Sequence, residues 1–313
     1  MVSVCMITYN HENFIKEAIE GVLNQKCNFI LELVIGEDFS TDATRILCEF
    51  YSKNNPAIKL LPSEKNIGVI PNLLRTIKAC KGKYIAICEG DDFWIDPLKL
   101  QKQFDYLELH PEYVLSYHNV VAINVIDDKR TRSELEEEIF TKEAEDIPVG
   151  HPTHTSSMLF RNIIINYPGD FDKIISGDSY LQFVLARYGE SIFQKNIYPN
   201  IRRRHPQSVW SYKSTEYKIE QRISLYEKLL EIAINQKEVK YLNKILIKNR
   251  IQYVKYLWNN QKKMESLKYL NKTSKEAFKY NLFLYFIFYN FYDLFSSSGG
   301  YMFLKSKFRT SLK

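Results

Sequence analysis

The chain has 313 residues, 45% of them hydrophobic, which is enough for one large core or for a core with a smaller appended unit. No segment has the low hydrophobicity and high charge of a disordered tail. The net charge of +6 hides an asymmetry, because residues 1–200 carry 20 Lys and Arg against 29 Asp and Glu, whereas residues 201–313 carry 23 against 8. The acidic part is suited to holding cations, and the basic part to facing phosphates, nucleic acid or an anionic membrane.

Strand and helix patterns alternate through the first 125 residues. Ser40 or Thr41 is expected to cap the second helix, and Asp96 the fourth, with Pro97 at its first position. Strands are predicted at residues 2–9, 31–35, 58–61 and 83–88, and helices at residues 10–25, 41–51, 69–80 and 96–109. This alternation predicts an α/β fold with a mostly parallel sheet covered by helices on both faces.

The alternation breaks after residue 125. The patterns predict a strand at 113–123, an exposed insertion at 127–148, a strand at 157–161, a helix at 178–188 and an extended segment at 191–201. From residue 214 the pattern is helical, with little Gly or Pro. We therefore expect two parts, an α/β domain over residues 1–212 and a basic helical C-terminal region over residues 213–313.

Cysteine usage and hydropathy bear on the compartment. The five cysteines all lie within the first 90 residues, inside apolar patterns and without a C-x-x-C pair, which predicts buried free thiols in a reducing environment. No run of about 20 apolar residues predicts a spanning helix, and the chain opens on a strand pattern instead of a secretion signal. These features predict a cytoplasmic protein.

Polar residues follow three of the predicted strands at the points where they end. Ligands bind at the carboxyl ends of the strands in sheets of this kind, so these residues are expected to meet at one edge. They are Thr8, Tyr9 and Asn10 after the first strand, Glu37, Asp38 and Ser40 after the second, and Glu89 to Asp92 after the fourth.

The acid-rich stretch Glu89-Gly90-Asp91-Asp92 needs a physical reason, because its three carboxylates repel one another. A divalent cation with oxygen ligands, Mg²⁺ or Mn²⁺, would stabilise them and would also hold a diphosphate. The alternative is an acidic turn that leads to the helix cap at Asp96. Asp38 also has two interpretations, as an acceptor for a base N–H or a ribose hydroxyl, or as an acid near a helix start. No G-x-G-x-x-G and no P-loop is present, so a glycine cradle for the diphosphate is not expected.

Four segments, in this order, resemble the family 2 glycosyltransferases, enzymes with a GT-A nucleotide-sugar fold. They are VSVCMITYNHENFIKEAIEGVLNQ, LELVIGEDFSTDAT, LPSEKNIGVIPNL and GKYIAICEGDDFWIDPLKLQKQ, and a weaker continuation in SGDSYL and IRRRHPQSVW extends to about residue 212. The resemblance implies a GT-A sheet, a nucleoside-diphosphate sugar donor and an inverting transfer assisted by Mn²⁺ or Mg²⁺. A UDP-sugar is favoured, because the Asp38 carboxylate suits uracil N3–H. A glycan or lipid-linked acceptor in bacterial surface polysaccharide or glycolipid assembly is implied as well.

The resemblance also implies roles for individual residues. Asp91 falls on the metal-binding D-x-D motif, and His205 lies in the loop that closes over the diphosphate and can ligate the metal. Asp178 falls on the general base, although a carboxylate there could instead only cap its helix. Glu89 departs from the usual Asp and stands between a ribose contact and a metal contact. The residues implied to bind the nucleotide sugar are Thr8, Tyr9, Asn10, Glu12, Asp38, Ser40, Asn66, Glu89, Gly90, Asp92 and Arg204.

Other features keep alternatives open. Residues 282–295 are apolar but too short to span a bilayer, so they predict either a buried core helix or an interfacial helix. The second interpretation would bring the protein to the inner face of the cell membrane, since basic residues follow. His151 and His154 lie three apart without further zinc ligands, and by position they are expected to line the acceptor pocket.

Two other functions compete with glycosyl transfer. A sugar nucleotidyltransferase also needs acids on an α/β sheet, but it would carry a Gly-rich, Lys- or Arg-bearing loop after the first strand, where TYNHENF stands. A non-catalytic nucleotide-sugar binding protein is the second competitor. Nucleic acid is not an expected partner, because the first 200 residues are acidic.

Overall fold

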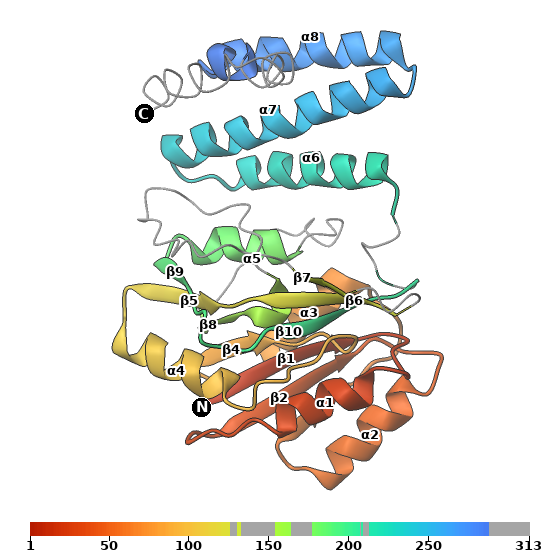
Figure 1. The fold of residues 1–313 in the computed structure, drawn as a ribbon, viewed down its shortest axis with the longest axis vertical. Coiled ribbons are helices and arrows are strands. Elements are labelled where there is room, and N and C mark those ends of the chain that lie inside the picture. The colour runs from red at the N-terminus through yellow and green to blue at the C-terminus, as the bar shows by residue number, and fades with distance from the viewer. Residues whose placement is uncertain (126–129, 133–153, 164–176, 207, 209–212, 288–313) are drawn as a thin grey trace. The chain divides into compact units, whose positions relative to one another are not determined.

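The computed structural model describes residues 1–125, 130–132, 154–163, 177–206, 208 and 213–287 (Figure 1). The chain divides into two compact units, Met1–Tyr212 and Lys213–Lys313. Each unit is described by itself below.

The first unit is built on a seven-stranded sheet of order β3-β2-β1-β4-β8-β5-β9. Neighbours pair in parallel except at β8, which is antiparallel to both β4 and β5. The prediction of a mostly parallel sheet is therefore confirmed. The strands are β1 (Val2–Thr8), β2 (Leu31–Glu37), β3 (Ile58–Leu60), β4 (Tyr84–Ile87), β5 (Tyr113–Tyr117), β8 (Leu159–Arg161) and β9 (Glu190–Phe193).

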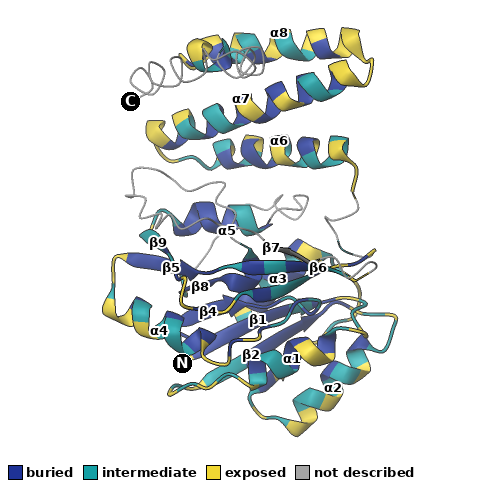
Figure 2. Cartoon of the chain, viewed as in Figure 1, coloured by how far each residue is buried: buried dark blue, intermediate teal, exposed yellow. Residues whose placement is uncertain are grey.

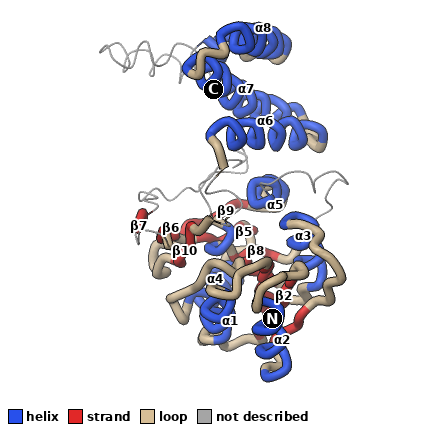
Figure 3. The backbone as a smooth tube through the Cα atoms, turned by 90° about the vertical axis from the view of Figure 1, so that its right-hand side faces the viewer, coloured by secondary structure: helices blue, strands red, loops and turns tan. Residues whose placement is uncertain are grey.

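Helices flank the strands on both sides (Figure 3), because the central strands are apolar on both faces. Val4 and Met6 of β1 face a core shared with Ile15 and Ile19, and the central strands β1 and β4 are almost wholly buried (Figure 2). On the other face α3 packs against β1 and β2, and α5 lies beside α3. The helices of this unit are α1 (Ile15–Leu23), α2 (Thr44–Asn54), α3 (Val69–Ala79), α4 (Lys99–Leu109) and α5 (Gly177–Leu185).

The single strand predicted at 113–123 is wrong, because it is two strands in two different sheets. The Tyr117 carbonyl accepts a hydrogen bond from Gln194 of the main sheet, whereas the Asn119 carbonyl accepts one from Asn200 of a smaller sheet. The buried His118 lies at this change of partner. The smaller sheet has the order β10-β6-β7, with β6 (Val120–Asn124) parallel to β10 (Asn200–Arg204) and antiparallel to β7 (Arg130–Arg132). Apart from β7, the predicted insertion at 127–148 lies outside the described residues.

Three predicted helix starts are also wrong, because the residues expected to begin the helices lie in the loops before them. Helix α1 begins at Ile15 and not at residue 10, since Asn10 has a positive φ of 55°. Ser40 and Thr41 do not cap α2, which begins at Thr44. Asp96 accepts a hydrogen bond from the Leu98 backbone N–H, but in a turn that precedes α4.

The second unit contains three helices, α6 (Thr215–Glu231), α7 (Gln236–Asn259) and α8 (Lys263–Lys279). Ser214 caps α6 and Asn235 caps α7, each by accepting a backbone N–H three residues ahead. The buried Arg250 joins the three helices by ion pairs with Glu227 of α6 and Glu276 of α8. Within the described ranges, no helix has the length and apolarity to cross a membrane. Of the apolar segment 282–295, residues 288–295 lie outside the described residues.

The prediction of buried cysteines is confirmed for four of the five thiols, and Cys27 is half-buried. All five thiols are free. Burial raises the pKa of the Cys27 thiol to about 11 and that of Cys48 to about 12, so both stay protonated at neutral pH. They act as small apolar side chains of the core.

One buried lysine makes the stability of this unit dependent on pH. The Lys99 ammonium is fully buried, 4.1 Å from the centroid of the Trp94 ring and 2.8 Å from Gln103 Oε1. Burial lowers the pKa of Lys99 to about 7, against the nearby charges that raise it. The unfolded chain therefore binds one more proton between about pH 7 and its ordinary pKa, and stability rises with pH in that window.

Replacing Lys99 with methionine is expected to raise the melting temperature at pH 6.5 and to raise it less at pH 9.5. Methionine fills a similar volume without the buried charge, whose cost disappears in the wild type as pH rises. Thermal unfolding of both proteins across this range measures the effect, and the exposed Lys53→Met serves as a control with no such trend. An equal change at both pH values would show that the Lys99 charge is not the cause.

Candidate active site

The acid-rich stretch is positioned by a close approach of two backbones. The β4 strand pairs in parallel with β1, and the Gly90 backbone N–H donates to the Ile7 carbonyl at 2.9 Å. A Cβ atom at Gly90 would lie 2.5 Å from Thr8 Oγ1 and 2.7 Å from Thr8 Cβ. Glycine therefore allows Glu89, Asp91 and Asp92 to lie directly beside the end of β1.

Gly90→Ala is expected to lower the free energy of unfolding by roughly 1–3 kcal/mol and to weaken donor binding, since the buried Thr8 has no room to yield. Gly177→Ala is the matched control, because its Cβ would meet the end of the flexible Ile70 side chain, which can rotate away. Chemical unfolding compares the two variants. A Gly90→Ala protein as stable as the Gly177→Ala protein would contradict the close packing.

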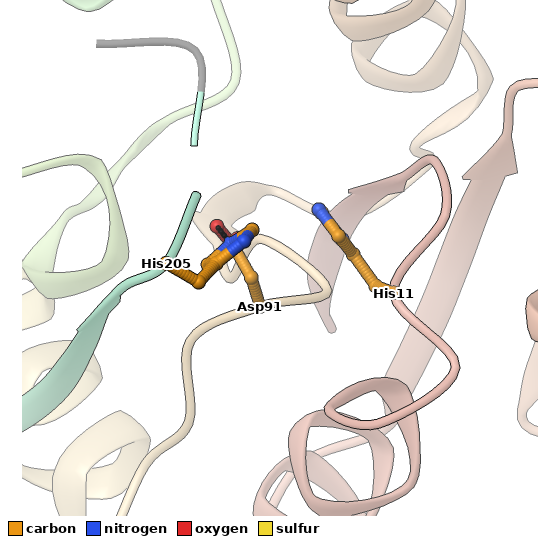
Figure 4. A group of neighbouring side chains, drawn as sticks. All are labelled: His11, Asp91 and His205. Atoms are coloured by element: carbon orange, nitrogen blue, oxygen red, sulfur yellow. Dashed lines mark hydrogen bonds and ion pairs between the residues drawn. The ribbon is translucent and has the colours of Figure 1, made fainter. Parts of the chain in front are cut away.

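Three side chains meet around Asp91 (Figure 4). His11 comes from the loop after β1, Asp91 from the loop after β4, and His205 from the end of β10. One ligand atom from each lies within 4.8 Å of the other two, and His205 Nε2 lies 3.0 Å from Asp91 Oδ2. The ring of Phe14 packs 4.9 Å from that of His205 and closes the group on one side. The three segments are far apart in the sequence, and the fold brings them together.

The chemistry of this group fits a divalent cation. His205 is 1% exposed, and its Nδ1 atom has no hydrogen-bond partner among the described residues. Burial would raise the pKa of Asp91, but the hydrogen bond from His205 and the charges of both histidines lower it to about 2. Burial lowers the pKa of His11, which leaves a neutral imidazole, the form that binds metals. One ionised carboxylate and two imidazoles make a suitable set of ligands.

Glu89 and Asp92 belong to a second group, with His154. The Thr155 hydroxyl donates to Glu89 Oε1, and the other Glu89 oxygen is buried without a partner among the described residues. Burial and the charge of Asp91 raise the pKa of Glu89 to about 7, and burial raises that of Asp92 well above its usual range. The segment predicted to line the acceptor pocket thus places His154 3.7 Å from Asp92. His151 lies outside the described residues.

Asp178 is the second residue of α5 and lies close enough to Glu89 for their charges to interact. Burial raises the pKa of Asp178, against the hydrogen bond from the Ser179 backbone N–H and the positive charge of Arg202. The Ser179 backbone N–H donates to Asp178 Oδ1 at 2.8 Å.

The predicted nucleoside residues tie two loops together. The Asn10 backbone N–H donates to the Ser40 hydroxyl at 3.0 Å, and the Thr41 N–H donates to Asn10 Oδ1 at 2.9 Å. Glu12 accepts the Ala43 N–H at 2.9 Å. Asn10, Ser40 and Glu12 therefore hold the ends of β1 and β2 at one edge, as the sequence predicted.

Three more of the predicted nucleotide-sugar residues lie around the same edge. Asp38 is 2% exposed and accepts the backbone N–H groups of Ile67 and Gly68, one on each oxygen. Asn66 also accepts from Gly68, so both side chains shape this loop. Tyr9 is 41% exposed, with its ring available to a ligand.

The three arginines of β10 have different environments. Arg203 is buried and structural: its Nη1 donates to the Asp91 carbonyl at 2.9 Å, its backbone N–H donates to Asp92 Oδ1 at 3.0 Å, and its guanidinium pairs with Glu17. Arg202 is half-buried. Burial, together with the positive charge of Arg202, lowers the pKa of His154 to about 3. Arg204, the predicted phosphate ligand, is exposed.

Sequence reasoning missed His11 and the structural role of Arg203, and it did not foresee that His154 lies beside Asp92. His11 follows the first predicted strand directly, which was the available signal, because the carboxyl end of that strand was expected to meet Asp91. The structural role of Arg203 had a weaker signal, the alternation of side chains along a strand.

Comparison with known proteins places this geometry in a family. The sequence model of the family described as Glycosyl transferase family 2 matches residues 3–167, more than half of the chain. The chain belongs to glycosyl transferase family 2. It is therefore a glycosyltransferase, as the resemblance implied.

Relatives of this glycosyltransferase match part of its length. An uncharacterized protein of Mycobacterium tuberculosis is 42% identical over 123 residues, 39% of this chain and 36% of the relative. A putative teichuronic acid biosynthesis glycosyltransferase of Bacillus subtilis, TuaG, is 31% identical over 107 residues, 34% of this chain and 42% of the relative. The chain thus spans less than half the length of these curated relatives.

Solved structures support the GT-A fold. TarS 1–349 of S. aureus, in complex with UDP-GlcNAc, has a TM-score of 0.61 at 16% identity and covers 86% of this chain and 78% of its own. The mannosyltransferase PcManGT of Pyrobaculum calidifontis, in complex with GDP-Man and Mn²⁺, has a TM-score of 0.53 at 14% identity. The match covers 93% of this chain and 87% of PcManGT. At these identities the likeness concerns the fold.

Proposed function

We propose that this glycosyltransferase moves a sugar from a nucleoside-diphosphate sugar to an acceptor hydroxyl by a single inverting displacement assisted by Mn²⁺ or Mg²⁺. The observation that carries the proposal is the meeting of Asp91, His205 and His11 at the end of β4, in a family of sugar-transferring enzymes. A UDP-sugar is the favoured donor. The acceptor is a glycan or a lipid-linked sugar in bacterial surface polysaccharide or glycolipid assembly, the field to which the name of TuaG also points.

Asp91, His205 and His11 would hold the cation. Two imidazoles beside one carboxylate favour Mn²⁺ over Mg²⁺, because imidazole nitrogen suits the softer ion. When bound, the cation would neutralise the charge that develops on the leaving diphosphate. Arg202, whose charge reaches Asp92, His154 and Asp178, adds positive potential at the same place.

Asp178 would accept the proton of the acceptor hydroxyl. In the displacement, the hydroxyl oxygen bonds to the anomeric carbon as the bond to the diphosphate oxygen breaks, and the hydroxyl proton passes to the Asp178 carboxylate. A pKa raised by burial makes this carboxylate a better proton acceptor than an exposed one. Asp38, Asn66, Asn10 and Tyr9 would surround the nucleoside, with Thr8, Glu12, Ser40 and Gly90 keeping the loops in place.

The test is a calorimetric titration of the full chain with UDP-sugars and GDP-mannose, with and without Mn²⁺, followed by measurement of nucleotide release and of the anomeric configuration of any product. Metal-dependent binding of one donor, with release of the nucleoside diphosphate and an inverted product, is expected. Pyrophosphate formed from a sugar phosphate and a nucleoside triphosphate would instead indicate a nucleotidyltransferase. Binding without release or transfer would indicate a non-catalytic binding protein, and a retained configuration would contradict single displacement.

A further inference from the structure

The outer surface of α8 differs from the rest of the helical unit in composition. Ser266, Thr273 and Ala277 form the buried side of this helix. Lys268, Lys272, Lys275 and Lys279 recur at spacings of four, three and four residues, which places them on one exposed stripe on the other side. We name these four residues the lysine stripe.

An apolar strip lies beside the lysine stripe. Met264 is 71% exposed, Leu267 49% and Phe278 75%, and helical spacing places all three on one side of α8. Just after the helix, the exposed Phe283 packs against Phe278 with a ring-centroid distance of 6.2 Å. Figure 2 shows α8 with much of its length exposed. Isolated exposed apolar residues are ordinary, whereas a strip of this kind marks an interaction site.

Charge indicates what covers this surface. Within the described part of the chain, Lys268, Lys272 and Lys275 form no ion pair, and the acid Glu276 is already engaged by the buried Arg250. The one exposed acid of the helix, Glu265, lies in its first turn. A row of unpaired lysines beside exposed aromatic and aliphatic side chains is the pattern of a helix that lies in the plane of an anionic bilayer. The lysines snorkel toward the head groups while the apolar strip enters the interface.

We propose that the outer face of α8, the lysine stripe together with Met264, Leu267, Phe278 and Phe283, binds the surface of a membrane containing anionic phospholipid. The binding would hold the enzyme where lipid-linked acceptors reside, although it does not depend on the proposed chemistry. A second copy of this chain is a poorer occupant, because two lysine stripes would repel each other.

The test is flotation of the full chain with vesicles of phosphatidylcholine alone or of phosphatidylcholine with phosphatidylglycerol, without any donor. Binding to the anionic vesicles, weakened by high salt, is expected, with little binding to neutral ones. Lys268→Gln/Lys272→Gln/Lys275→Gln should lower partitioning about 100-fold, since each lysine near such a surface contributes a factor of about five. Phe278→Ser should lower it roughly tenfold.

The matched control is Lys53→Gln/Lys78→Gln/Lys81→Gln, three exposed lysines of the first unit with the same change in charge. It should bind vesicles nearly as the wild type does, and circular dichroism should show all variants folded. If both triple variants lost the same amount of vesicle binding, net charge alone would explain the effect, and the assignment to α8 would be overturned. Vesicle binding that persists in Phe278→Ser and in the α8 triple variant would also overturn the assignment. A protein that does not bind vesicles but self-associates, and loses that self-association in Phe278→Ser, would overturn it as well. Because no donor is present, none of these results depends on sugar transfer.

Discussion

Asp91→Ala is expected to abolish the dependence of donor binding on Mn²⁺. Asp91 supplies the one ionised carboxylate of its group, with a pKa held at about 2 by His205 and the nearby histidine charges despite burial. Loss of even an outer hydrogen-bonding partner costs roughly 10–100-fold in metal affinity, so loss of this ligand should exceed about 100-fold. Calorimetric titration of Mn²⁺, and of the donor at fixed Mn²⁺, measures both affinities.

Two further variants make this result interpretable. Asp91→Asn keeps the shape of the side chain and removes its charge, so it separates metal binding from folding. Asp105→Ala removes an exposed acid from α4 and should leave both affinities unchanged. If Asp91→Asn bound the donor with undiminished Mn²⁺ dependence, the cation site would lie elsewhere, and the group of Glu89, Asp92 and His154 would be the next place to look.

Asp178→Asn is expected to leave donor affinity within about twofold of wild type and to lower the transfer rate by roughly 10²–10⁴-fold, the usual contribution of a general base. Asparagine keeps the hydrogen bond from the Ser179 N–H at one oxygen but cannot accept the hydroxyl proton. Binding is measured by calorimetry, and turnover by release of the nucleoside diphosphate in the presence of acceptor.

The same experiment can identify a different base. Asp105→Asn, which changes the same chemical group at an exposed position, should retain full turnover. A rate within tenfold of wild type in Asp178→Asn would show that the proton goes elsewhere. Glu89, whose charge interacts with that of Asp178 and whose second oxygen is buried without a partner among the described residues, would then be the candidate for a Glu89→Gln test.

The sequence predicted the sheet edge well, because apolar runs and parallel pairing follow from local pattern. The carboxyl ends of β1, β2 and β4 do meet, and Asn10, Ser40 and Gly90 lie there as expected. Helix starts were less predictable, because polar side chains near a helix start can either cap it or bind a neighbouring loop. Ser40 and Thr41 bind Asn10, a contact between loops 30 residues apart that no local pattern contains.

The local sequence pattern also could not predict which side chains gather around the candidate cation site. His205 was predicted from a family resemblance, whereas the sequence around His11 and His154 did not predict that they lie beside Asp91 and Asp92. His205 follows β10, which pairs with β6 in the smaller sheet. Its position therefore depends on the break between Tyr117 and Asn119, which the unbroken strand predicted at 113–123 concealed.

The contacts of Arg203 have a consequence for how the protein is made. This residue joins Glu17, Asp91 and Asp92, across sequence separations of 186, 112 and 111 residues. Contacts this distant form late, because the intervening chain must close first. During synthesis from the N-terminus, the acid-rich stretch Glu89–Asp92 therefore forms its contacts with Arg203 only after Arg203 has left the ribosome. Until then its carboxylates repel one another without the hydrogen bonds that Arg203 donates. A nascent chain that stops before β10 has most of its sheet but an unsupported centre, so the enzyme gains its chemistry only when the first unit is nearly complete.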